Sequence, residues 1–146
     1  MTKRNPLAVA ILLPWPPAEL NPNRSRRLHW SVRSRAAREY REDAFKAALA
    51  ARTPGLRQHP LSAPVQASVT FVARERRRRD LDNLLAAFKP AWDGFIDAGL
   101  LSNDHAAALA ISMRLEVRPV SDVDCWPFVE VLLQPHIERT LAREGR

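Results

Sequence analysis

The sequence has little cysteine and no long apolar run, and both shortages narrow the class of protein. Cys125 is the only cysteine among 146 residues, which excludes an intrachain disulfide and a metal site built on cysteine pairs. Such cysteine usage is typical of a reducing compartment. The apolar run in PLAVAILLPWPP stops at proline after about seven residues, so we expect neither a membrane span nor a signal peptide. These features predict a soluble, cytoplasmic protein with no membrane partner.

Acidic residues are fewer than basic residues in this sequence. The chain has 16 Asp and Glu against 23 Lys and Arg, which gives a net charge of +7. Nucleic acid is the commonest partner of a small basic domain, ahead of an anionic membrane or an acidic protein. Apolar residues make up 46% of the chain. This share and the length predict one folded domain over residues 1–146.

The order of apolar patterns predicts an α+β fold in which helices pack on a mixed sheet. The element order is strand, helix, strand, helix, strand, strand, from periodicities of two and of three to four residues. The pattern predicts strands at residues 7–13, 65–73, 107–117 and 128–133, and helices at residues 31–52 and 83–98. Asp82 or Asn83 would cap the second helix, and Pro90 would kink it. Residues 18–30 read as a loop, and the tail from about 135 to 146 as a short helix or a frayed end.

Two aspartates directly follow the densest positive charge, in the stretch RRRRDLDN. At the end of an extended strand, Asp80 and Asp82 would point to one side. Two carboxylates so placed repel each other unless a cation joins them. Oxygen ligands suit Mg²⁺, with Mn²⁺ able to substitute. Asp104, in the polar turn SNDH, is the best third ligand.

The arginines then fit as a layer that binds the phosphates of a polyanion next to the negative site. Lys89 lies about two helical turns after Asp82, and helical side chains lean toward the N-terminus. Its ammonium could therefore stabilise charge on a transferring phosphoryl group. The candidate DNA-binding residues are Arg24, Arg26, Arg27, His29, Arg76, Arg77, Arg78 and Arg79.

Simpler explanations exist for each of these residues. Asp80 could serve simply to balance the charge of the arginines, and Asp82 could serve simply to cap a helix. Lys89 and Asp93 have the i,i+4 spacing of a surface ion pair worth ~0.3 kcal/mol. Four successive arginines are more often a solvated edge than a specific site.

Three stretches together resemble the RusA family of Holliday junction resolvases, which are small endonucleases of bacteria and their prophages. They are LPWPP with the later NPNRSRRLHW, then RRRRDLDN, then KPAWDGFIDAGLLSNDH. The resemblance in order and spacing covers residues 7 to about 118, most of the chain. The resemblance implies Mg²⁺-dependent cleavage of four-way DNA junctions by a homodimer, with paired symmetric nicks, in DNA recombination and repair.

The resemblance also implies roles for single residues. Asp80 and Asp82 match the paired metal-binding aspartates, and Asp104 matches the second residue of the later acidic pair. Lys89 matches the family lysine when counted back four residues from Asp93. Two departures stand out. Lys89 is nine residues past Asp80, about one helical turn further than in some members, and Asn103 replaces one acid of the pair.

Other interpretations stay open at this point. The chain could be a structure-selective DNA-binding module without catalysis, a nuclease for other branched DNA, or a small interaction protein whose charge keeps it soluble. A helix over residues 83–98 would be ~24 Å long, and Asp104 follows its far end. A kink, an early helix end, the following strand or a second subunit would have to bring Asp104 to Asp82. For the dimer interface, we expect the strand at residues 7–13 and the residues around Phe95 and Leu100.

Overall fold

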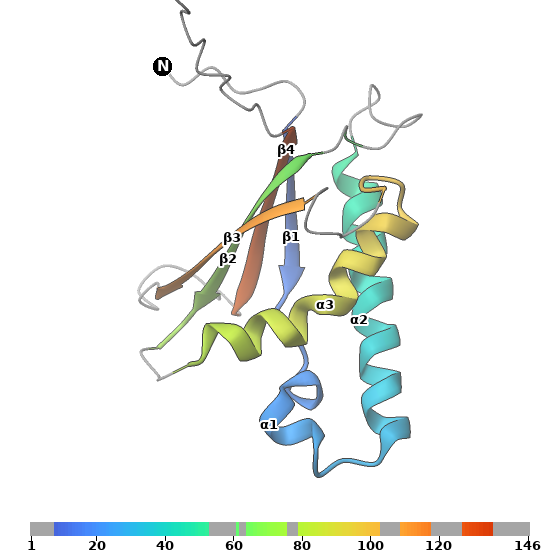
Figure 1. Ribbon diagram of the computed structural model, residues 1–146, viewed down its shortest axis with the longest axis vertical. Helices are drawn as coiled ribbons and strands as arrows, with labels where there is room; N and C mark the ends of the chain where they lie inside the picture. Colours follow the sequence, from blue (N-terminus) through green and yellow to red (C-terminus); the bar gives the residue numbers. More distant parts are fainter. Residues whose placement is uncertain are drawn as a thin grey trace, which may run out of the picture.

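The computed structural model describes residues 8–52, 61, 64–75, 79–102, 109–117 and 127–135 (Figure 1). The strands are β1 (Val9–Pro14), β2 (Val65–Ala73), β3 (Leu109–Val117) and β4 (Phe128–Pro135). The helices are η1 (Ala18–Leu20), α1 (Pro22–Ser25), α2 (Trp30–Ala51) and α3 (Leu81–Asp97). The α+β class and the predicted order of the main elements are confirmed.

The four strands form one mixed sheet in the order β1-β4-β2-β3. β4 is antiparallel to both β1 and β2, whereas β2 and β3 are parallel, with Val65 opposite Leu109 and Ala73 opposite Val117. Two parallel neighbours need a crossover connection, and α3 provides it. The chain therefore enters α3 beyond the carboxyl end of β2 and re-enters the sheet at the opposite end.

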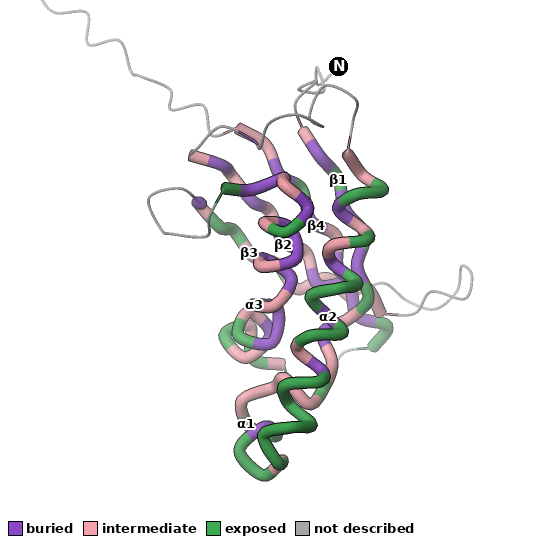
Figure 2. Tube along the Cα trace, turned by 90° about the vertical axis from the view of Figure 1, so that its right-hand side faces the viewer, coloured by how far each residue is buried: buried purple, intermediate pink, exposed green. Residues whose placement is uncertain are grey.

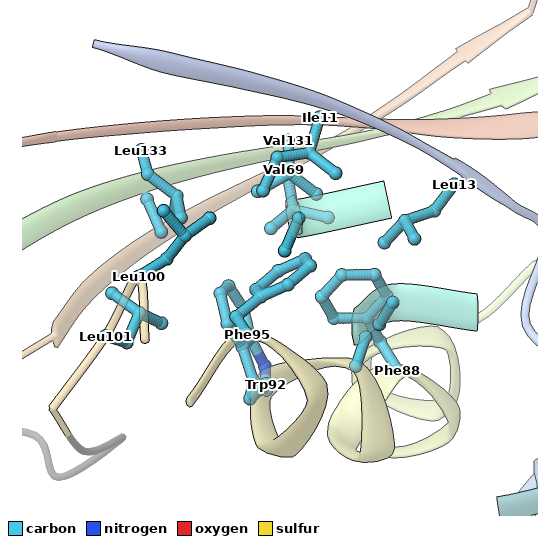
Figure 3. Packing of buried hydrophobic residues seen from close by; sticks show 14 of the residues in the cluster. Ile11, Leu13, Val69, Phe88, Trp92, Phe95, Leu100, Leu101, Val131 and Leu133 are labelled. Carbon is cyan, nitrogen blue, oxygen red and sulfur yellow. The ribbon is translucent and has the colours of Figure 1, made fainter. Parts of the chain in front are cut away.

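Helices α2 and α3 lie on one face of the sheet (Figures 1 and 2). Alternate residues of β2, including Val69 and Phe71, are buried on that face, together with alternate residues of β1 and β4. Figure 3 shows Phe88, Trp92 and Phe95 of α3 pointing toward this layer of aliphatic side chains. Each such side chain removed from water contributes roughly 1.5–3 kcal/mol, so this layer holds α3 against the sheet.

The two long helices approach each other closely at Gly94. A Cβ atom added there would lie 2.7 Å from the Cβ atom of Ala44 in α2 and would also meet the carbonyl oxygen of Arg41. Nearby, the Arg41 guanidinium donates two hydrogen bonds to the carboxylate of Asp97, at 2.6 and 2.8 Å. The close approach at Gly94 and this ion pair join the far end of α3 to α2.

The element bounds differ from the predicted ones in places. β2 is confirmed at residues 65–73, and α2 begins and ends one residue earlier than expected. The predicted loop at residues 18–30 contains η1 and α1, because the side chain of Asn21 accepts the backbone N–H of Asn23 and Pro22 occupies the first helical turn. The predicted tail at residues 135–146 lies, except for Pro135, outside the described residues.

Two further expectations concern α3. Figure 1 shows α3 changing direction near its middle, where the predicted kink at Pro90 falls. The expected dimer surface around Phe95 and Leu100 is wrong, because both side chains are fully buried in the core of the single chain. A buried side chain cannot also pack against a second subunit, so any interface must use other residues.

Candidate functional site

Asp80 occupies the N-cap position of α3. Its backbone is extended, with φ −91° and ψ 117°, and its Oδ1 atom accepts the backbone N–H of Asp82 at 2.9 Å. Aspartate is among the best N-cap residues because the first helical N–H groups lack partners within the helix. The prediction that Asp82 or Asn83 caps this helix is therefore wrong.

The sequence suggested that the two aspartates point to one side at the end of a strand. The structure places them differently. β2 ends at Ala73, Asp80 lies outside regular structure, and Asp82 belongs to the first turn of α3. Both residues are exposed at this helix end. The positive end of the helix dipole favours carboxylates here, by roughly 0.3–1 kcal/mol each. The helix end, and not the pleat of a strand, therefore holds the two acids close together.

Asp82 and Lys89 lie along one side of α3, in keeping with their separation of about two turns. Both border a hollow of about 390 Å³ between α3 and the start of β3. Its lining consists of Asp82, Leu85, Ala86, Lys89, Trp92, Leu109 and Ile111. The ion pair between Lys89 and Asp93 that the sequence allowed does not form in this part of the described structure. The Lys89 ammonium is therefore exposed on the side of α3 that carries Asp82.

Asp104 lies outside the described residues, so the structure does not place it. Leu109, five residues later in the sequence, lines the hollow that Asp82 and Lys89 border. Within residues 8–52, 61, 64–75, 79–102, 109–117 and 127–135, no three His, Cys, Asp or Glu side chains converge on a point. The described part of the candidate metal site thus consists of Asp80 and Asp82.

The donor chemistry of this pair fits a hard divalent cation. The N-cap hydrogen bond occupies one lone pair of Asp80 Oδ1, while a carboxylate offers about four. Both acids are exposed, so capping and metal binding are compatible at Asp80. Mg²⁺ is commonly held by one or two carboxylates and keeps several waters. The described residues could therefore supply two of the ligands, with Asp104 as the proposed third.

A second hollow lies on the Asp80 side of α3. It has a volume of about 700 Å³ and is lined by Trp15, Asn21, Asn23, Arg79, Asp80, Leu81, Asn83 and Leu84. A neighbouring hollow of about 480 Å³ shares four of these residues and adds Arg24 and Arg27. Two of the predicted DNA-binding arginines therefore line a surface that adjoins the Asp80 hollow.

Arg79 lines the same hollow as Asp80 and Trp15. Its guanidinium is 5.6 Å from the centre of the Trp15 ring, and its Nη1 atom donates to the carbonyl oxygen of Glu75 at 3.0 Å. The ring of Trp15 packs against Phe71 in turn. These contacts hold a cation directly before Asp80.

The remaining predicted DNA-binding residues fall into two groups. Arg26 and His29 are exposed where α1 leads into α2. Arg76, Arg77 and Arg78 lie outside the described residues. Sequence reasoning missed the contribution of Asn21 and Asn23 to the hollow; the Asn-Pro pair that starts α1 was the available signal.

Among the described residues, no helix is long and apolar enough to cross a membrane.

No protein-family model matches the sequence. The chain is similar to an uncharacterized protein of Xylella fastidiosa (strain Temecula1 / ATCC 700964), with 38% identity over 89 residues. The similar part is 61% of this chain and 56% of that protein, so the chain spans a little over half of the relative's length.

Proposed function

We propose that this protein is a Mg²⁺-dependent endonuclease that cuts branched DNA, with four-way junctions as the substrate and a homodimer as the active form. One observation carries the proposal. Asp80 and Asp82 lie exposed at one helix end, between the hollow that joins the arginine surface and the hollow that contains Lys89. A phosphate backbone that crosses this helix end would meet cations on both sides of the acidic pair.

Each side chain has a distinct role in this account. Asp80, Asp82 and Asp104 would hold Mg²⁺, which when bound supplies an activated water and stabilises charge on the oxygens of the reacting phosphate. Lys89, on the Asp82 side, would stabilise charge that develops on the phosphoryl oxygens. Arg24, on the Asp80 side, would bind a neighbouring phosphate together with Arg27 and thereby position the strand.

The distribution of charge also supports a nucleic-acid substrate. The span from residue 24 to residue 38 contains six arginines and no acidic residue. By contrast, α3 and its cap carry four aspartates and one lysine. Basic surfaces raise the local concentration of DNA and release its counterions on binding, and the acids would then act on a backbone that the arginines hold.

A structure-selective DNA-binding protein without catalysis is the second candidate, and one observation favours it. Asp80 has a structural role, because its side chain caps α3. Asp82, in the first turn, also suits the helix dipole without any metal. On this account the basic surface alone would carry the function.

A cleavage assay on a panel of DNAs tests the proposal. The panel contains a four-way junction, a flap, a single strand and a linear duplex, each with Mg²⁺ and with a chelator. We expect Mg²⁺-dependent cuts in the junction at symmetric positions, and little cutting of the linear duplex. Binding of the junction without cutting at any Mg²⁺ concentration would favour the second candidate.

A further inference from the structure

The connection between α1 and α2 forms a projection beyond the end of the sheet (Figures 1 and 2). We use the name elbow for residues 24–38, which are the end of α1, this connection and the first nine residues of α2. Trp30, the first residue of α2, lies on it with 67% of its surface exposed. Single exposed apolar side chains are common on protein surfaces, so exposure alone does not indicate a role. The neighbourhood of Trp30 supplies the further observations.

The residue before Trp30 sets the start of α2. The Nδ1 atom of His29 accepts the backbone N–H of Ser31 at 3.2 Å, so His29 caps α2 with its ring. The same nitrogen lies 2.7 Å from the Ser31 hydroxyl oxygen. The His29 and Trp30 rings lie beside each other, with centroids 5.5 Å apart and planes tilted by 36°. Two exposed rings are therefore held together at a helix start.

The elbow is also strongly basic. It carries six arginines and no Asp or Glu, and all six are exposed. They are Arg24, Arg26, Arg27, Arg33, Arg35 and Arg38. An exposed indole on a segment with six exposed arginines combines the two features that bind single-stranded nucleic acid: a stacking platform for bases and cations for the backbone.

We propose that Trp30, supported by His29, is a base-stacking element that engages unstacked bases at the branch point of DNA or in a single strand. The inference rests on the proposed function for the statement that DNA lies along the elbow. The bases of a continuous duplex cover one another's faces, whereas a branch point exposes some of them. Stacking on Trp30 would therefore make binding selective for branched over continuous DNA, in addition to the unselective attraction of the arginines.

The selectivity can be measured without cutting, in the presence of a chelator. We would compare the parent protein with Trp30→Ala and Trp30→Phe, and with Leu49→Ala as the matched control. Leu49 is an exposed apolar residue at the other end of the same helix. Affinities are measured for a four-way junction, an oligothymidine strand and a long linear duplex. A 2-aminopurine at the branch point reports stacking by its fluorescence.

We expect Trp30→Ala to weaken binding of the junction and of the single strand about 10-fold, as removal of one base–aromatic stack does. The linear duplex should lose less than about 2-fold, because only unstacked bases reach the ring. Trp30→Phe should restore most of the affinity and of the 2-aminopurine quenching. Leu49→Ala should match the parent on all three DNAs. Because Trp30 is outside the core, the melting temperature should stay unchanged.

Three results would overturn the inference. The first is an equal loss of affinity for the junction and for the linear duplex, which would mean that Trp30 lies near the DNA backbone without stacking on bases. The second is no loss on any DNA. The third is a difference in sedimentation between Trp30→Ala and the parent protein without DNA, which would assign Trp30 to a protein–protein contact. If Asp82→Asn abolishes cleavage while Trp30→Ala binds normally, only this inference fails. If the parent neither cuts nor prefers branched DNA, the proposed function fails as well.

Discussion

The Oδ1 atom of Asp80 accepts the backbone N–H of Asp82 at 2.9 Å, so the first aspartate of the pair caps the helix that carries the second. The proposed metal site and the start of α3 thus share one side chain. A substitution at Asp80 can change the stability, the chemistry or both. Replacements that keep the cap without the charge separate the two effects.

Replacements of Asp80 should differ in their effect on stability but should all abolish cleavage. Asn and Ser are also good N-caps, whereas Ala is a poor one. Asp80→Ala should therefore lower the free energy of unfolding by ~1 kcal/mol, and Asp80→Asn and Asp80→Ser by much less. All three should lose Mg²⁺-dependent cleavage. Urea unfolding measures the stability, and a junction-cleavage assay measures the activity. If Asp80→Ser cleaves at the parent rate, the role of Asp80 is that of a helix cap only.

Lys89→Ala should slow cleavage while leaving DNA affinity nearly unchanged. Lys89 borders the same hollow as Asp82, where its ammonium would meet charge that develops during the reaction. Loss of one such interaction costs roughly 10²-fold in rate. Lys46→Ala is the control, because Lys46 is an exposed lysine of α2 that pairs with Glu42 at 3.3 Å, away from this hollow. Equal single-turnover rates for the two variants would remove Lys89 from the proposed site.

Binding of DNA should need no metal and should weaken steeply with salt. If about six phosphates are contacted, log K should fall against log salt with a slope near −5. Arg24→Ala combined with Arg27→Ala should reduce the steepness by about 2, because each arginine would release about one counterion. Arg114→Ala should not change the slope. Arg114 pairs with Thr70 on the face of the sheet opposite the helices, so an equal effect there would argue against the assigned surface.

The ion pair between Arg41 and Asp97 should make a small contribution to stability that disappears in acid. The hydrogen bonds from Arg41 hold the pKa of Asp97 below its usual value of 3.8. The contribution is complete above that value and is lost as the pH falls through the lowered pKa. Both side chains are exposed, so Asp97→Asn should cost less than about 1 kcal/mol at pH 7.

Unfolding free energies of the parent and of Asp97→Asn, measured from pH 7 down to pH 2, test this account. The two curves should converge toward the acid end, and added salt should bring them together at pH 7. A difference that grows as the pH falls would contradict a lowered pKa of Asp97 in the folded protein.

The strand β2 and the helix α2 could be predicted almost to the residue, because their patterns are local. Val65 to Ala73 alternate with a period of two directly after Pro64. In α2, residues such as Ala36 and Tyr40 recur at helical spacing and are buried. Such periodicities depend on one face of the element alone. The order of the strands in the sheet could not be predicted in this way. In the sheet, β4 lies between β1 and β2, although it comes last among the described elements.

The start of α3 could not be predicted correctly, because Asp80, Asp82 and Asn83 are all good capping residues. The choice follows from the extended backbone of Asp80, which the sequence does not reveal. The part of the expected dimer surface around Phe95 and Leu100 failed for a related reason. Apolar residues such as Phe95 suit an interface and a core equally well by composition, and the single chain buries them. Asp104, which the resemblance places in the site, lies outside the described residues.

The central claim is that the acids at the start of α3 hold the metal for DNA cleavage. The most direct measurement is the cleavage rate and the affinity of Asp82→Asn on one synthetic four-way junction. The substitution removes ligand charge but keeps the shape of the side chain, so folding and binding should survive. We expect the rate to fall at least ~10³-fold, equivalent to ~4 kcal/mol of barrier, with affinity equal to or tighter than the parent. Cleavage near the parent rate would contradict the claim.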